Sequence, residues 1–186
     1  MLFKRYSKYS ITIFLCLFSA SVYLWFLNIE YEKRIELLYA IGVYDSLNFK
    51  IFLATFTHTK LTHLFFNMVG ISILGGWLEN CLDKLQYFIT IVVSIFFSWL
   101  YYILRVPIKP AVGASGLVFG FLGVFIGLQN RTIRRITLIL AIALIIITLP
   151  NLPPDATDIH LAGFLIGVLL SIIFSYANEQ PNPALS

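Results

Sequence analysis

Charged residues are scarce in this chain. Only 12% of its 186 residues are Asp, Glu, Lys or Arg, whereas 59% are hydrophobic. A soluble globular domain carries about 25% charged residues. The deficit excludes an ordinary water-soluble domain and indicates that lipid is the main solvent. A chain of this length has room for one compact helical domain.

Cysteine and histidine are also sparse. The two cysteines, Cys16 and Cys81, lie in and just beyond hydrophobic runs, so neither is placed for an external disulfide. Their separation matches no metal-binding cysteine pattern. The three histidines are His58, His63 and His160. We therefore expect neither a metal nor an organic cofactor.

Six hydrophobic runs approach the roughly 20 helical residues that cross a bilayer core. They cover about residues 9–29, 61–79, 85–104, 113–130, 136–150 and 159–177. The sequence thus predicts an all-α integral membrane protein with a single domain over residues 1–178 and a short polar tail over 179–186. The first run is longer than a signal-peptide core and is followed by no clear Ala-x-Ala site, so we expect it to be retained.

Lys and Arg in the loops predict the orientation of the spans. The N-terminal tail carries three of these residues, as does the loop between the fourth and fifth runs, whereas the segment 150–158 carries none. This distribution favours cytoplasmic N- and C-termini, although Arg105 and Lys109 weakly oppose it. The net charge of +4 then reflects topology, and no nucleic-acid partner is expected. In the long first loop, Tyr31–Gly42 has the spacing of a short amphipathic helix at the membrane interface.

Polar clusters occur at the start of the second, fourth and sixth runs. These clusters are His58-x4-His63-x3-Asn67, Gly113-Ala114-Ser115-Gly116 and His160-Leu-Ala-Gly163. With the N-terminus inside, all three runs begin at the outer face. The topology therefore predicts one site at one depth, near the outer surface of the membrane.

Ser115 is a candidate nucleophile. Its flanking glycines allow close backbone approach, and the amides of a helix start can stabilise an oxyanion. Taken alone, the serine is better explained by a helix cap among packing glycines. The fourth run carries a stripe of glycines at positions 116, 120, 123 and 127.

In the sixth run, Gly163 and Gly167 share a helix face with His160. Small residues four apart allow close helix crossing in membranes. If the two glycine faces meet, His160 comes within reach of Ser115 and can accept its proton. The alternative is a histidine that is simply satisfied within the core.

His63 and Asn67 are four residues apart, so they share a helix face, and both can donate hydrogen bonds to an oxyanion. His58 lies one turn outward and could hold the loop or order water. A buried polar network that pins the second span is the structural alternative. Metal binding is disfavoured because no carboxylate or cysteine joins the histidines and the His-Glu-x-x-His pattern is absent.

Together, the three motifs resemble the rhomboid family of intramembrane serine proteases, and they occur in the expected order along nearly the whole chain. The resemblance implies a six-transmembrane-helix rhomboid-like bundle that cleaves transmembrane segments of other membrane proteins in the lipid bilayer. It implies a catalytic dyad of Ser115 as nucleophile and His160 as base. The oxyanion hole would comprise the His63 and Asn67 side chains and the backbone amides of Ser115 and Ala114.

The same resemblance assigns supporting roles. Gly113 would shape the turn before the nucleophile, Phe119 would stack on His160, and Glu79 would join a structural network at the inner end of the second span. The remaining supporting residues are His58, Gly116, Gly163 and Gly167.

The chain also departs from the family pattern, since Phe49 and Lys50 occupy positions where Trp-Arg is common. This difference concerns anchoring of the first loop rather than catalysis. The minimal six-span form is typical of bacteria, which implies the inner (plasma) membrane, with the site opening to the outer face. Substrates would enter between the second and fifth spans, and the segment 150–158 is a candidate lid.

Two functions from other classes remain open. A catalytically inactive rhomboid-like protein would bind or escort membrane helices without needing the dyad. A small transporter would place its polar groups near the bilayer centre, on broken helices.

Overall fold

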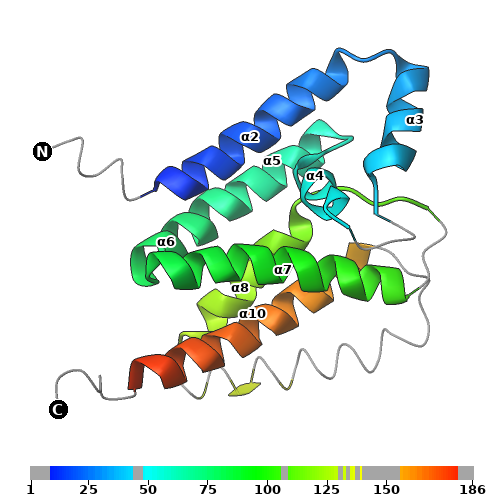
Figure 1. Ribbon diagram of the computed structural model, residues 1–186. Coiled ribbons are helices and arrows are strands. Elements are labelled where there is room, and N and C mark those ends of the chain that lie inside the picture. Colours follow the sequence, from blue (N-terminus) through cyan, green and yellow to red (C-terminus); the bar gives the residue numbers. More distant parts are fainter. Residues whose placement is uncertain are drawn as a thin grey trace, which may run out of the picture.

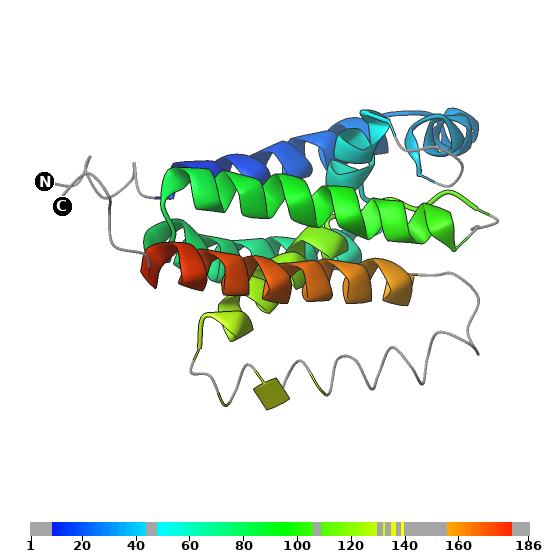
Figure 2. The same cartoon turned by 60° about the horizontal axis from the view of Figure 1, so that its bottom comes forward.

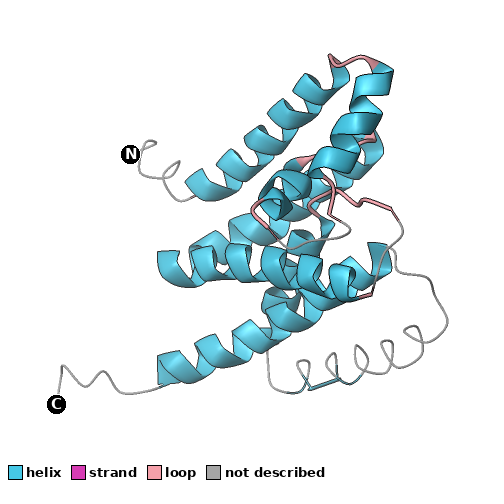
Figure 3. Ribbon diagram, turned by 45° about the vertical axis from the view of Figure 1, so that its right-hand side comes forward, coloured by secondary structure: helices cyan, strands magenta, loops and turns pink. Residues whose placement is uncertain are grey.

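A computed structural model describes residues 9–43, 48–105, 109–129 and 156–179, together with residues 132, 135, 136 and 139. Within these ranges the regular structure is helical apart from one isolated bridge between Val43 and Ala111 (Figure 3). The helices are α2 (Ser10–Leu27), α3 (Tyr31–Ile41), α4 (Lys50–Phe56), α5 (Leu61–Gly70), η1 (Ile71–Gly75), α6 (Gly76–Cys81), α7 (Lys84–Leu104), α8 (Ser115–Gly127) and α10 (Ala156–Glu179). The prediction of an all-α membrane bundle is confirmed.

Four helical segments are long and apolar enough to cross a membrane. They are α2, the run Leu61–Cys81 formed by α5, η1 and α6, helix α7, and Thr157–Ala177 within α10. Helix α8, in the fourth predicted span, has only 13 residues. Apart from residues 136 and 139, the fifth predicted span, 136–150, lies outside the described residues, as do residues 180–186 of the expected tail. The count of six spans therefore stays a prediction. The helix expected over Tyr31–Gly42 is confirmed as α3.

Helix α8 occupies the interior of the bundle, where it contacts α5, η1, α7 and α10. Helices α5, α8 and α10 all begin at the end of the bundle that α3 and α4 occupy (Figures 1 and 2). We call this the site end, because it holds His58, Ser115 and His160. The opposite end, which we call the distal end, holds Thr12, Glu79 and Tyr87. The first residue of α2 and the last of α10 both lie at the distal end.

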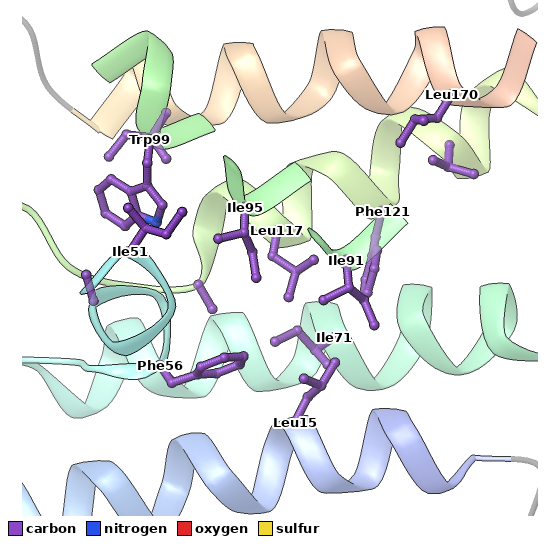
Figure 4. Close-up of a cluster of buried hydrophobic side chains, with 14 of the residues drawn as sticks. Leu15, Ile51, Phe56, Ile71, Ile91, Ile95, Trp99, Leu117, Phe121 and Leu170 are labelled. Carbon is purple, nitrogen blue, oxygen red and sulfur yellow. The ribbon is translucent and has the colours of Figure 1, made fainter. Parts of the chain in front are cut away.

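The apolar core is built around α8. Figure 4 shows Leu117 and Phe121 of α8 converging with Ile71 of η1 and with Ile91 and Ile95 of α7. Ile71 and Phe121 are fully buried. Because lipid tails are as apolar as these side chains, close packing rather than transfer from water stabilises such a core.

Helices α8 and α10 touch backbone to backbone. A Cβ atom added to Gly163 would overlap the carbonyl oxygen of Gly116, and one added to Gly167 would overlap that of Gly120. On α8, a Cβ atom on Gly123 would overlap the carbonyl oxygen of Phe164. The two glycine faces predicted from the sequence therefore meet, and any side chain between them would force the helices apart.

At the distal end, Glu79 closes the start of α2. Its Oε1 accepts a hydrogen bond from the Ile11 amide, and its Oε2 accepts one from the Thr12 amide, both at 2.9 Å. The Thr12 hydroxyl donates to the same Oε2 at 2.7 Å and lies 2.9 Å from the Tyr87 hydroxyl. First-turn amides have no intrahelical partner, so a carboxylate there satisfies them and complements the helix dipole. The network implied for Glu79 is present and joins α2, α6 and α7.

The second predicted span contains one irregularity that the hydrophobic pattern does not signal. Residues Ile71–Gly75 form a π-helical turn between α5 and α6. Gly75, at its end, lies so close to Phe121 that an added Cβ atom would be 2.8 Å from the phenyl ring. The wide turn thus brings the middle of this span against α8, and π turns of this kind are frequent near functional sites.

Candidate active site

The segment before Ser115 is held in place by main-chain hydrogen bonds. Val43 and Ala111 exchange two of them, each 3.1 Å long, and the Gly113 amide donates to the Ala54 carbonyl at 2.8 Å. These bonds fix residues 111–113 against α4 and the end of the first loop. They hold the chain extended up to the point where α8 begins.

Gly113 makes the turn into α8. Its φ of 127° is a conformation that residues with a side chain rarely adopt. A Cβ atom at this position would also overlap the ring of His63. The glycine expected to shape the turn is therefore required both by the backbone conformation and by the close approach of His63.

Ser115 is the first residue of α8 and is 8% exposed. It lies among the amides of a helix start, which can stabilise negative charge. Its location next to Gly116 matters because Gly116 packs against Ile159 and Ser98, so the first turns of α8 and α10 are in contact. The nucleophile candidate thus lies where the two glycine faces begin to meet.

His160 is on α10 and stacks on Phe119. The two ring centroids are 4.4 Å apart and the rings are inclined by only 7°. Phe119 follows Ser115 by one helical turn, so the two residues share a face of α8. The stack therefore directs the imidazole of His160 toward the face of α8 that carries Ser115.

His58 is fully buried just before the membrane-spanning run Leu61–Cys81. Its Nε2 lies 2.9 Å from Nδ2 of Asn67 and accepts a hydrogen bond from the Ala114 amide at 3.4 Å. Because Nε2 accepts from a backbone amide, Nδ1 carries the proton and donates to the Phe56 carbonyl at 3.3 Å.

The surroundings of His58 favour the same neutral form. Burial and the neighbouring His63 lower the pKa of His58 to about 4, against the opposing effect of the hydrogen bond to Phe56. The side chain is thus an uncharged acceptor at neutral pH. The sequence predicts His58 outside the second span, where it could hold the loop. It precedes α5, which begins at Leu61, and its ring lies against Asn67.

His63 completes a polar cluster beside the nucleophile turn. Its ring meets that of His58 edge-on, with centroids 5.1 Å apart, and packs on Gly113. The cluster of His58, His63 and Asn67 therefore touches Gly113 and Ala114 directly. One detail differs from the expected oxyanion hole, because the Ala114 amide donates to His58 in this structure.

Sequence reasoning did not identify every residue that shapes this site. Helix α4 was not expected, yet its Thr55 accepts a hydrogen bond from Trp99 Nε1 at 2.8 Å and its Ala54 accepts the Gly113 amide. No local pattern marks such long-range bonds. Within the described residues, no group of three or more His, Cys, Asp or Glu side chains is arranged to hold a metal ion.

The fold and the site define a multi-pass helical membrane protein with a serine, a histidine and a polar cluster gathered at one end of the bundle. This chain belongs to the rhomboid family, since the sequence model of the rhomboid domain matches residues 45–177. That family contains both active intramembrane serine proteases and inactive members.

Two relatives from Arabidopsis thaliana are similar to this chain. RHOMBOID-like protein 1 is 29% identical over 170 residues, which cover 84% of this chain and 43% of the relative. RHOMBOID-like protein 4 is 27% identical over 140 residues, which cover 68% of this chain and 35% of the relative. The chain thus spans less than half the length of these curated relatives.

Proposed function

We propose that the protein is an intramembrane serine endopeptidase that cleaves transmembrane segments of other membrane proteins with a Ser115–His160 dyad. The stack of His160 on Phe119 is the observation that carries the proposal, because it holds a base against the helix face of a buried serine. A histidine whose pKa lies near neutrality suits this task. The charge pattern of the loops supports cytoplasmic termini and a site near the outer face. The minimal six-span form supports the inner membrane.

The proposed reaction has two steps. In the first, the Ser115 hydroxyl attacks the scissile carbonyl carbon while His160 accepts the hydroxyl proton and passes it to the leaving amine. In the second, water gives a proton to His160 and attacks the acyl carbon, and His160 then returns the proton to the Ser115 oxygen as the ester bond breaks, which releases the carboxylic acid and restores both residues. Both tetrahedral intermediates carry negative charge on the former carbonyl oxygen.

Stabilisation of that oxyanion falls to the polar cluster. His63, Asn67 and the Ser115 backbone amide are the proposed donors, and one such donor typically changes the rate by about 100- to 1,000-fold. The Ala114 amide contributes directly only when it leaves His58. In the arrangement observed, His58 holds both Asn67 and Ala114 by its Nε2 atom.

The chemistry also constrains the substrate. A peptide bond within a helix is shielded by its own turn, so the segment must unwind before Ser115 can reach a carbonyl carbon. Small or helix-breaking residues at the cleavage site are therefore favoured. Lateral entry between the second and fifth spans, with the segment 150–158 as a lid, belongs to the same proposal. Most of the fifth span and most of this segment lie outside the described residues.

The decisive experiment combines two assays on purified protein in detergent. Wild type should cleave a model transmembrane substrate and be labelled by a fluorophosphonate probe, whereas Ser115→Ala should do neither. Ser175→Ala is the matched control, because this serine lies on α10 and its hydroxyl donates to the Ser171 carbonyl, away from the site. Unchanged cleavage by Ser115→Ala would refute the dyad.

The same assays separate the inactive alternative. A wild-type protein that binds a transmembrane helix but shows neither cleavage nor labelling would be an inactive member that escorts membrane helices. Both residues of the dyad are present in this chain, which favours the protease.

A further inference from the structure

The last two turns of α7 connect three segments that carry the site. Trp99 and Tyr102 lie on α7, and Arg105 is the residue that follows it. The three residues are spaced at intervals of three, and each makes a hydrogen bond to a different segment. Ser98, the residue before Trp99, packs against both Gly116 of α8 and Gly163 of α10. The end of α7 is therefore in contact with both helices that carry the proposed dyad.

Two of these hydrogen bonds join α7 to segments that hold the chain before Ser115. Trp99 donates to Thr55 of α4, the helix whose Ala54 accepts the Gly113 amide. The Tyr102 hydroxyl donates to the Lys109 carbonyl at 3.1 Å, on the approach to α8. Trp99 and Tyr102 are both 2% exposed, so this side of the connection is buried.

The third hydrogen bond joins Arg105 to the first turn of α10, which carries His160. Arg105 Nε lies 3.3 Å from Oδ1 of Asp158, and the two side chains are 25% and 10% exposed. Asp158 is in the first turn of α10, two residues before His160. Two residues correspond to about 200° around a helix, so the carboxylate and the imidazole point in nearly opposite directions. Holding Asp158 on α7 therefore fixes the rotation of the first turn and keeps His160 against Phe119 of α8.

The ion pair also suits its position electrostatically. Arg105 follows the C-terminal end of α7, and Asp158 is near the N-terminal end of α10, so each charge complements the dipole of its own helix. A partly buried, hydrogen-bonded pair constrains geometry more than an exposed one does.

We propose that Arg105 and Asp158 are positioning residues that fix the first turn of α10 and thereby orient His160 toward Ser115. This proposal rests on the protease function proposed above. It adds a specific claim, namely that the end of α7 sets the geometry of the base through one ion pair.

The test compares Arg105→Gln, Asp158→Asn and the double variant with wild type in detergent. Hydrogen exchange of the backbone over residues 156–164 reports the order of the first turn without depending on catalysis. Cleavage of a model transmembrane substrate gives kcat and KM separately. The matched control is Glu30→Gln, which breaks an exposed pair with Lys33 whose side chains are 68% and 77% exposed.

We expect each single variant to exchange about tenfold faster over 156–164 and to lose about tenfold in kcat with KM unchanged, as expected for a charged hydrogen bond. Because the two residues act as one pair, the double variant should resemble either single variant. Glu30→Gln should change neither quantity. If Arg105→Gln does not fold, Arg105→Lys keeps the charge but loses the planar guanidinium, and the same measurements apply.

Unchanged exchange in both single variants would overturn the proposal. Faster exchange with wild-type kcat would also overturn it, because the ordered turn would then be irrelevant to His160. A wild-type protein without turnover refutes the protease function and with it the catalytic role of the pair, a result that is distinct because it appears before any variant is made.

Discussion

The distal end and the site end of the bundle bury polar groups in different ways. At the distal end, the Glu79 carboxylate accepts three hydrogen bonds of 2.7–2.9 Å that join α2 to α6. At the site end, the neutral ring of His58 makes its contacts to Phe56, Asn67 and Ala114 at 3.3, 2.9 and 3.4 Å. One end relies on a charged acceptor, and the other on uncharged groups and stacked rings.

This difference suggests that the distal end contributes mainly to stability and the site end to the proposed chemistry. Charge-assisted hydrogen bonds are shorter and about twice as strong as neutral ones. The distal network therefore stabilises the packing of α2, α6 and α7 against one another. In the proposed mechanism the site transfers protons and needs groups that can change partners, as Ala114 would do by leaving His58. Polar groups at a functional site are often less well satisfied than those elsewhere in the same protein.

The largest expected effect concerns His160. His160→Ala should lower kcat by at least about a thousandfold, because the serine then has no base, while the unfolding temperature changes little. Tyr87→Phe at the distal end should show the reverse, with normal kcat and lower stability. Cleavage assays and thermal unfolding in detergent measure both. Equal losses of activity in the two variants would contradict the division between the ends.

Asn67 should have the next largest effect. Asn67→Ala is expected to lower kcat by about 100-fold through loss of an oxyanion donor. Because His58 holds Asn67 in place, His58→Ala should also lower kcat, and the double variant should lose less than the product of the two single losses. Strictly multiplicative losses would argue against the His58–Asn67 connection.

Substitution of Glu79 tests whether the distal end contributes to stability without affecting catalysis. Glu79→Gln should lower the free energy of unfolding by about 2–3 kcal/mol, since hydrogen bonds to a charged group are lost from the start of α2. The kcat of the folded fraction should stay at the wild-type value. Unfolding by denaturant in detergent gives the first quantity and initial rates give the second. A drop in kcat at full folding would show that the two ends are not independent.

Stability should also depend on pH through His58. The folded state keeps this pKa near 4, whereas the unfolded chain titrates near 6.5, so the unfolded state binds more protons between these values. The contribution of neutral His58 is therefore complete above pH 6.5 and is lost as the pH falls toward 4, by about 3 kcal/mol. The difference in unfolding free energy between wild type and His58→Gln, measured against pH, isolates this group. A difference that does not vary between pH 6.5 and 4 would contradict the assignment.

Phe119 should give the smallest effect. Phe119→Leu removes the stack on His160, and such ring contacts are worth about 0.5–1.5 kcal/mol, so kcat should fall about threefold to tenfold. Phe119→Tyr retains the ring and should stay close to wild type. If both variants behave alike in the cleavage assay, the stack does not orient the base.

Much of this fold could be predicted from the sequence. Hydrophobic runs mark the long helices because a bilayer core demands a minimum length. Glycines at intervals of three and four predicted the face by which α8 meets α10. The resemblance to rhomboid proteases added the stack of Phe119 on His160 and the network around Glu79, and both are present.

The remaining features depend on contacts between distant parts of the chain. Helix α4 is only seven residues long, and its place is fixed by Trp99 and Gly113 rather than by its own pattern. The hydrophobic run placed His58 before the second span, but its contacts with Asn67 and Ala114 join residues far apart in the sequence and could not be predicted. Ion pairs such as that of Arg105 with Asp158 leave no periodic signal at all.

The direct contact of main-chain atoms between α8 and α10 has a consequence for how the protein responds to its surroundings. Where side chains separate two helices, their spacing shifts whenever rotamers rearrange with temperature or lipid composition. Here Gly116 and Gly163 leave no such layer, so hard atomic radii set the separation of the two helices. The alignment of serine and histidine would then tolerate a thinning, thickening or cooling membrane, and any opening for a substrate would have to come from other helices.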